Sequence, residues 1–307
     1  MRRIGGPTSS TGSRAVNGPR PRRRSRGRRR GGWHHGAMRL PSSDEVDLAV
    51  HDLGGTGPPL LMTHATGLHG RAWGPLAPAL ASRFRCWSFD FRGHGDSSRP
   101  GGGDFDWRGF GDDVLAVVAG LGLERPYGFG HSQGATALLL AEQTRPGTFA
   151  GLYLFEPVAP PTDAPPPPMD DHPLVLGALR RRDEFASVGA AIDRLGSKPP
   201  LADFHPEALR AYVEHGVHPL PDGGVELKCR PSDEAEVYRT GVRNRAFAHL
   251  GEVSCPVTLA RGTRSRSLGA ELAARQAALL GHGRSEELDG LGHFGPLEDP
   301  DRVAQAV

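Results

Sequence analysis

A serine between two glycines is the first feature of this sequence that could do chemistry. Gly130-His131-Ser132-Gln133-Gly134 follows the strand-like run YGFGH (127–131) and precedes the helix-like run ALLLAEQTR (137–145). This is the pattern G-x-S-x-G in a strand–turn–helix context. A turn this tight leaves no room for side chains at 130 and 134, and it lifts the serine hydroxyl above the sheet. We therefore predict that Ser132 is a nucleophile.

A histidine near the end of the chain is predicted to be the general base. His293 lies in Gly290-Leu291-Gly292-His293-Phe294, a loop after the last predicted strand, near 284–288. A serine hydroxyl is a weak nucleophile until a base takes its proton, and histidine titrates near neutral pH. The chain order, with the serine before the histidine, is the one expected for this kind of turn.

Two backbone N–H groups are predicted to bind the oxyanion that forms when a serine attacks a carbonyl. His64-Ala65-Thr66-Gly67 follows the apolar run PLLMT, a position that supplies one donor in sites of this kind. We assign that donor to Thr66 and the second to Gln133, which begins the helix after Ser132. The alternative is that residues 64–67 form a turn with a structural role only.

The elements that must position these residues alternate between strand and helix. Apolar runs typical of buried strands occur at 46–52, 59–65, 84–91, 127–131 and 152–158. Segments with helical spacing lie between some of these runs, at 70–82, with Trp73, Leu76 and Leu80 on one face, and at 107–122. This alternation predicts an α/β fold, with a mostly parallel sheet and helices on both faces.

A long insertion interrupts the alternation. Residues 157–173 are rich in proline and are not expected to form regular structure. Helical patches without a strong strand follow, until the alternation resumes at 256–262, with a helix at 269–281 and a last helix after Pro296. We expect a core of residues 39–157 and 251–307 with a helical cap insertion at 158–250. Four histidines of the insertion are expected on the surface or in loops, with substrate contact as the alternative: His172, His205, His215 and His218.

Basic residues are concentrated at the N-terminus. Residues 1–38 hold eleven arginines and no acidic residue, and they lack apolar periodicity, so we expect a disordered extension. The alternatives are a targeting or nucleic-acid-binding arm, or a translation start placed upstream of Met38. Without these residues, 26 basic and 35 acidic residues remain, a net charge of −9. A body this acidic is unsuited to nucleic acid.

The remaining composition is ordinary for a globular protein, with 37% hydrophobic residues. No apolar run reaches the roughly 18 residues of a membrane span, so we expect no membrane association. Three cysteines are far apart and indicate neither a disulfide framework nor a metal site: Cys86, Cys229 and Cys255. We expect a cytoplasmic protein, and the sequence does not indicate its oligomeric state.

Together these motifs resemble the α/β-hydrolase superfamily, in particular its capped, single-domain bacterial members. The resemblance covers residues 45–156 and 253–307 and rests on HATG (64–67), FDFRGHGDS (89–97), GHSQG (130–134) and GLGHF (290–294). It implies an α/β-hydrolase fold with a cap. It also implies that Asp90 and His94 shape the loop beside the site rather than take part in catalysis.

The acid that should orient His293 departs from the commonest pattern of the family, an aspartate after the penultimate strand. Here that loop reads GTRSRSLGA, without a carboxylate. Some members, such as haloalkane dehalogenases, take the acid from the strand after the nucleophile's helix, where Glu156 ends the apolar run LYLFEPV. A buried carboxylate needs a partner, which His293 would be. We predict Glu156 as the acid. An ion pair of Glu156 with a cap arginine, and Asp289 as the acid, are the alternatives.

These residues predict a serine hydrolase that works through an acyl-enzyme, without a metal or another cofactor, on a small-molecule substrate. Serine at position 132 argues against dehalogenase or epoxide hydrolase chemistry, for which the resembling enzymes use aspartate. A small or medium carboxylic ester is the preferred substrate. The alternatives are hydrolysis of an amide, a lactone or a C–C bond, cofactor-free perhydrolysis, and a hydrolase fold that binds a ligand without turnover.

Overall fold

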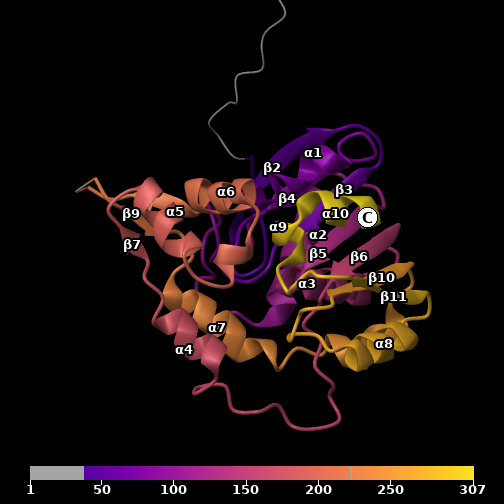
Figure 1. The fold of residues 1–307 in the computed structure, drawn as a ribbon. Helices are drawn as coiled ribbons and strands as arrows, with labels where there is room; N and C mark the ends of the chain where they lie inside the picture. The colour runs from indigo at the N-terminus through magenta and orange to yellow at the C-terminus, as the bar shows by residue number, and fades with distance from the viewer. Residues whose placement is uncertain (1–37, 222) are drawn as a thin grey trace, which may run out of the picture. The chain divides into compact units, whose positions relative to one another are not determined.

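A single twisted sheet organises the described part of the chain, residues 38–221 and 223–307 of a computed structural model (Figure 1). Its first two strands are antiparallel to the neighbours that they pair with, and the other six are parallel to one another. In spatial order the strands are β1 (Met38–Pro41), β2 (Asp47–Gly55), β4 (Arg85–Phe89), β3 (Pro59–Thr63), β5 (Tyr127–His131), β6 (Gly151–Phe155), β10 (Val257–Gly262) and β11 (Gly283–Leu288).

Alternate residues of the parallel strands pack into two cores on opposite faces of the sheet. Leu61 and Leu154 belong to one core, whereas Leu60 and Phe155 belong to the other. The first core includes side chains of α2 (Trp107–Gly120) and α3 (Gln133–Thr144). The second core includes side chains of η1 (Gly70–Trp73), α1 (Leu76–Leu80), α9 (Gly295–Glu298) and α10 (Pro300–Ala306). The helix α8 (Ala270–Leu279) packs beside β10 and β11. The predicted α/β class, with helices on both faces, is confirmed.

The predicted helix over 70–82 is two shorter pieces, η1 and α1. Gly74 and Pro75 separate them, because proline lacks the N–H that a continuous helix would use. Its three predicted face residues are nevertheless fully buried: Trp73, Leu76 and Leu80. The strand β1 also begins at Met38, which we had assigned to the disordered extension. The rest of that prediction falls on residues 1–37, outside the described residues.

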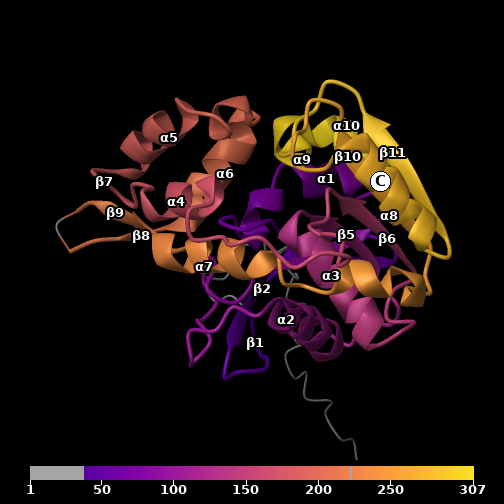
Figure 2. The ribbon, with the colours of Figure 1, turned by 90° about the horizontal axis from the view of Figure 1, so that it is seen from below.

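Residues 173–241 of the inserted segment (158–250) lie together at one side of the sheet in both views (Figures 1 and 2). The two ends of the segment instead contact α8, through Ala159 and Phe247. No regular element occurs from Pro157 to His172, as the prolines predicted. The helices that follow are α4 (Pro173–Leu179), α5 (Val188–Gly196), η2 (Leu201–Asp203), α6 (Pro206–Gly216), α7 (Pro231–Gly241) and η3 (Ala246–Glu252). The expectation of helices without strands was incomplete, because a small antiparallel sheet joins β7 (Glu184–Phe185), β9 (Val225–Leu227) and β8 (Val217–Pro219).

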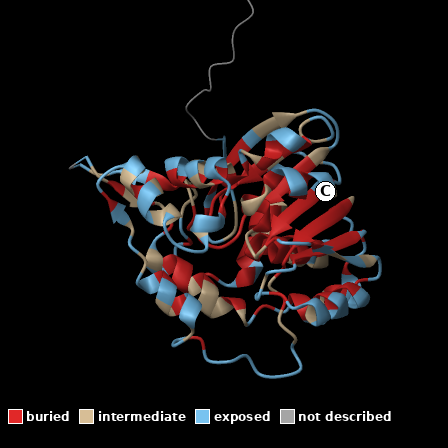
Figure 3. Ribbon diagram, in the orientation of Figure 1, coloured by how far each residue is buried: buried red, intermediate tan, exposed pale blue. Residues whose placement is uncertain are grey.

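Burial differs between these two parts of the molecule. The central strands β3, β5, β6 and β10 of the large sheet are almost wholly buried, whereas the edge strands β1 and β11 and the helices of the inserted segment keep exposed faces (Figure 3). The inserted helices therefore depend on fewer apolar contacts than the sheet does. No described helix is long and apolar enough to cross a membrane.

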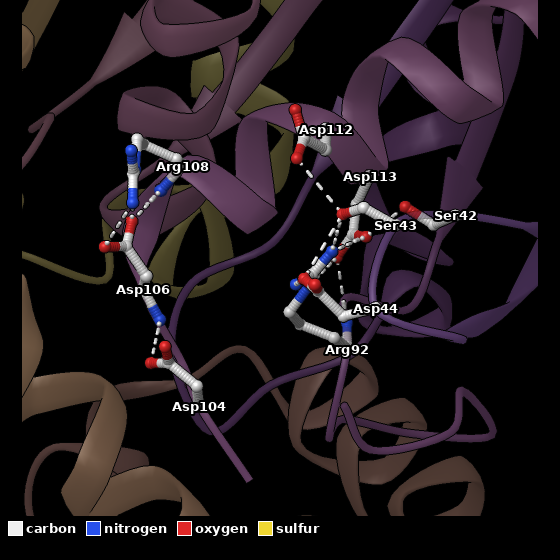
Figure 4. Close-up of polar contacts among 9 residues, drawn as sticks. All are labelled: Ser42, Ser43, Asp44, Arg92, Asp104, Asp106, Arg108, Asp112 and Asp113. Carbon is white, nitrogen blue, oxygen red and sulfur yellow. Dashed lines mark hydrogen bonds and ion pairs between the residues drawn. The ribbon is translucent and has the colours of Figure 1, made fainter. Parts of the chain in front are cut away.

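A buried arginine anchors the loop that follows β4. The Arg92 guanidinium makes two hydrogen bonds to Asp113, through Nε at 3.0 Å and Nη2 at 2.8 Å, and Nη1 donates to Asp44 at 2.7 Å. Ser43 and Ser42 occupy further donors and acceptors of the same network (Figure 4). This network holds the loop against α2 and the segment before β2.

Candidate active site

Ser132 lies at the turn between β5 and α3 with a strained backbone, φ 53° and ψ −117°. Non-glycine residues rarely adopt a positive φ, and holding one costs roughly 1–3 kcal/mol. The glycines of the motif allow this turn: a Cβ at Gly130 would lie 2.6 Å from the Cα of Ala135, and one at Gly134 would lie 2.5 Å from the carbonyl oxygen of Thr63. The turn therefore depends on close backbone approaches that only glycine permits.

Glu156 comes directly after β6, the strand beside β5. The Ser132 N–H donates to the carbonyl of Phe155 at 2.9 Å, which fixes the ends of the two strands side by side. The Glu156 side chain is buried, and its Oε2 lies 2.6 Å from Nδ1 of His293. A carboxylate in this place accepts a hydrogen bond from Nδ1–H, which leaves Nε2 of the neutral imidazole free to act as the base.

The loop that lacks the usual aspartate supports Glu156 instead. The Ser265 hydroxyl donates to Oε2 of Glu156 at 2.6 Å, and the Gly262 N–H donates to Oε1 at 2.9 Å. These donors stabilise a buried carboxylate. Asp289, the other candidate acid, lies at an exposed position and accepts a hydrogen bond from Thr263 at 3.1 Å. The alternative ion pair of Glu156 with an arginine is not among the contacts of the described residues.

His131, to which we had assigned no role, positions the histidine loop. Its Nε2 lies 2.8 Å from the carbonyl oxygen of His293, and the two imidazole rings are 5.0 Å apart. Burial lowers the pKa of His131 well below its usual value, so its ring is neutral and Nε2–H donates this bond. The residue before Ser132 in the motif therefore ties the turn to His293. His131 occupies a variable position of the G-x-S-x-G pattern, so the motif did not indicate this contact.

Thr66 and Gln133 lie together beside Ser132. The Thr66 hydroxyl donates to Oε1 of Gln133 at 2.8 Å, and both residues are buried. Gln133 begins α3, where backbone N–H groups have no partner inside the helix. In the part of the chain that the structure describes, neither backbone N–H donates to another protein atom. Two such donors are able to bind an anionic oxygen.

A cavity of about 240 Å³ adjoins these residues. Thr66 and Phe294, the neighbour of His293, form part of its wall, and the inserted segment provides much of the rest from α4, α6 and α7. The wall is mostly apolar, as in sites that bind small organic molecules. The sequence did not reveal this cavity, because it forms between distant segments.

A comparison with known protein families identifies the family of this chain. A family model described as the alpha/beta hydrolase family matches residues 60–306, which is most of the chain. The chain belongs to this family. The match begins in β3 and ends in α10, so it includes all five predicted site residues. The predicted family and fold class are thereby confirmed.

Curated relatives of this hydrolase differ in their substrates. It is 36% identical over 276 residues to the pimeloyl-(acyl-carrier protein) methyl ester esterase of Methylococcus capsulatus, covering 82% of this chain and 94% of the relative. It is 26% identical over 232 residues to the 2-(acetamidomethylene)succinate hydrolase of Mesorhizobium japonicum, covering 73% and 77%. A crystal structure of an E-2-(acetamidomethylene)succinate hydrolase, 23% identical, superposes with a TM-score of 0.75 over 89% of this chain and 97% of that one, which shows the shared fold.

Several other residues singled out in the sequence make contacts within the fold of the hydrolase. Asp90 accepts hydrogen bonds from the N–H groups of Gly70 and Asp96, at 2.7 and 2.8 Å. His172 and His205 cap the N-termini of α4 and α6. The three cysteines are buried and free. No group of three or more histidine, cysteine or acidic side chains within 38–221 and 223–307 is placed to hold a metal ion.

Proposed function

We propose that this protein hydrolyses a small or medium carboxylic ester through an acyl-enzyme formed on Ser132. The observation that carries the proposal is the 2.6 Å contact between the buried carboxylate of Glu156 and Nδ1 of His293. This contact is beside a strained serine turn and two unpaired N–H groups. A nucleophile, an oriented base and oxyanion donors at one edge of a sheet are the parts that acyl transfer needs.

The first step uses Nε2 of His293 to take the proton from the Ser132 hydroxyl as its oxygen attacks the ester carbonyl. The carbonyl oxygen becomes negatively charged and accepts hydrogen bonds from the N–H groups of Thr66 and Gln133. Glu156 keeps the imidazole in the required tautomer and stabilises the imidazolium. His293 then returns the proton to the leaving alcohol, whose departure gives the acyl-enzyme.

The second step repeats this chemistry with water. His293 takes a proton from a water molecule that attacks the acyl carbonyl, and the same two N–H groups hold the oxyanion. The proton then passes to Ser132 as the C–O bond to the acyl group breaks. A carboxylic acid and the free serine are the products.

Two observations favour an ester of modest size over the other substrates of hydrolases. The relative that is 36% identical over most of both chains is a methyl ester esterase by name. The cavity beside the site is about 240 Å³, slightly below the roughly 300–1,000 Å³ that is usual for ligand pockets. The inserted segment would act as a cap, because α4, α6 and α7 supply much of the cavity wall.

Labelling with a fluorophosphonate, with the adduct located by mass spectrometry, tests the proposal. We expect labelling at Ser132 in the unmodified protein and none in Ser132→Ala. Hydrolysis of methyl esters of increasing acyl length, followed by methanol release, should then be fastest for short chains. A folded protein without labelling would instead support a ligand-binding protein, and turnover of lactones or C–C substrates alone would reassign the bond that is cleaved.

A further inference from the structure

An arginine and a glutamate of the inserted segment lie in the wall of the cavity beside the candidate site. Arg181 follows α4 and Glu234 belongs to α7, and Nη1 of Arg181 lies 2.8 Å from Oε2 of Glu234. Both side chains are largely buried, with exposed fractions of 19% and 9%. Among the described residues that line the cavity, these are the charged ones, and their charges are opposite.

The pair packs directly on the loop that carries the proposed oxyanion donor. Gly67, next to Thr66, has φ +78°, and a Cβ there would lie 2.8 Å from Oε1 of Glu234 and 3.4 Å from Nη1 of Arg181. A substrate bound to that donor would therefore lie close to both charges. The pair is near enough to influence which substrates enter the site.

The pair also keeps an unused hydrogen-bond donor. Arg181 donates through Nη2 to the carbonyl of Cys229 at 3.0 Å, and Glu234 accepts at Oε1 from the Tyr238 hydroxyl at 3.3 Å. Oε2 of Glu234 is paired with Nη1 of Arg181, whereas Nε of Arg181 is buried without a hydrogen-bond partner among the described residues. The pair thus retains one donor, and buried polar groups of this kind are normally satisfied.

We propose that the Arg181–Glu234 pair selects uncharged polar substrates and excludes free carboxylates. The inference rests on the proposed ester hydrolysis and identifies its substrate class: esters with a neutral group, such as a primary amide, that accepts a hydrogen bond. A carboxylate beside the pair would be attracted by Arg181 and repelled by Glu234 at similar range. These effects largely cancel, while the cost of removing the carboxylate from water remains.

Three methyl esters of similar size test the substrate class: methyl succinamate (neutral and polar), monomethyl succinate (anionic) and methyl pentanoate (apolar). In the unmodified protein we expect kcat/KM for the succinamate to exceed that for the monomethyl succinate by about tenfold or more, since a charged group without net compensation is disfavoured. Equal values, or a preference for the acid, would overturn the proposal, and this comparison requires no variant.

The Glu234→Gln substitution removes one charge and nearly preserves the shape of the side chain. Arg181 then lacks a counter-charge, so the preference should shift toward monomethyl succinate by about tenfold or more. The matched control is Glu236→Gln, the same change on the same helix at a residue that pairs with Arg239 and does not line the cavity. That control should keep the original preference. An unchanged preference in folded Glu234→Gln would overturn the proposal.

Binding measurements separate this inference from the proposed reaction. Calorimetric titration of Ser132→Ala, with and without Glu234→Gln, uses succinamate and succinate monomethyl esters as ligands and needs no turnover. A gain in affinity for the acid alone supports the inference even where no ester is hydrolysed. Equal changes for acid and amide would contradict it, whereas absent turnover and labelling would contradict only the reaction.

Discussion

Two buried arginine–carboxylate pairs of this hydrolase differ in how completely they are satisfied. Arg92 meets Asp113 through two hydrogen bonds, and residues of the segment before β2 occupy its other donors (Figure 4). Arg181 meets Glu234 beside a cavity, and Nε of Arg181 has no hydrogen-bond partner among the described residues. Burial raises the pKa of both carboxyl groups, and the paired guanidinium opposes this in each case.

The difference indicates different roles for the same chemical pair. A saturated network has no capacity left for a ligand, so the Arg92 pair holds the loop after β4 in place. An unsaturated pair in a cavity wall keeps hydrogen-bonding capacity at the place where a substrate would bind. Glu156 is likewise a buried carboxylate with hydrogen-bond partners, and one of these partners is the candidate base His293.

The largest effect on activity is expected from a substitution of Glu156, whose carboxylate contacts the candidate base His293. Glu156→Gln should reduce kcat by about ten-thousand-fold, because an amide favours the wrong imidazole tautomer, while the fold is kept. Rates of ester hydrolysis and thermal unfolding curves measure the two parts of this prediction.

The control for Glu156 is the other acid near the histidine loop. Asp289→Asn should leave kcat within about twofold, because Asp289 is exposed and contacts Thr263 rather than His293. A large loss in Asp289→Asn together with an active Glu156→Gln would assign the acid to Asp289 and contradict our assignment.

Breaking the saturated pair should affect stability rather than chemistry. Asp113→Asn leaves the Arg92 charge buried without full compensation, so the free energy of unfolding should fall by about 3–5 kcal/mol. Denaturation in urea measures this change. The neighbouring Asp112→Asn removes one hydrogen bond to Ser43 at a partly exposed position and should cost roughly 0.5 kcal/mol or less. A loss of kcat in a fully folded Asp113→Asn would place the loop in the catalytic machinery.

A smaller effect is expected at a histidine that connects the sheet to the inserted segment. His69 lies 2.9 Å from the carbonyl of Tyr212 in α6. Burial lowers its pKa to about 4, which Asp90 opposes. The pKa of His69 is lower in the folded state than in the unfolded state. The contribution of neutral His69 to the free energy of unfolding is therefore fully present above about pH 6.5 and is lost as the pH falls toward 4.

The free energy of unfolding should therefore decrease on acidification from pH 7 to 5, with roughly 2 kcal/mol of the decrease due to His69. The same titration of His69→Gln should have a slope that is less steep by that amount, whereas the exposed His282→Gln should match the unmodified protein. Equal slopes in all three proteins would show that His69 is not buried as a neutral ring.

The smallest effect is expected from thiol reagents. Burial raises the pKa of Cys86 to about 11, and it raises that of Cys229 and Cys255 to about 12. All three thiols should fail to react at pH 7.5 in the folded protein and should react fully in denaturant. Faster labelling of Cys229 than of Cys86 would show that the inserted segment, which carries the Arg181 pair, opens more readily than the sheet.

The fold was largely predictable from local patterns. Short apolar runs marked most strands of the large sheet, and the glycines at 130 and 134 marked the turn at Ser132. The short strands β7, β8 and β9 were missed because two or three residues are too few for a period. The break at Gly74 and Pro75 was missed because an apolar helical spacing continued through it.

The partners within the site were less predictable. Glu156 could be proposed because a single carboxylate ended an apolar strand. The Ser265 hydroxyl that supports Glu156, and the contact between His131 and the histidine loop, had no signal in the sequence. Side-chain contacts of this kind depend on the order of strands in the sheet, which alternating patterns do not specify.

The sequence by itself determined the α/β class, the tight turn at Ser132 and the strand directly before Glu156, because these depend on residues close together in the chain. Only the tertiary structure decided that Glu156 contacts His293 and that Arg181 meets Glu234 at the wall of one cavity. Both pairs join residues more than fifty positions apart. The physical reason is that local periodicity fixes the course of the backbone, whereas packing across the sheet and the inserted segment fixes which side chains meet.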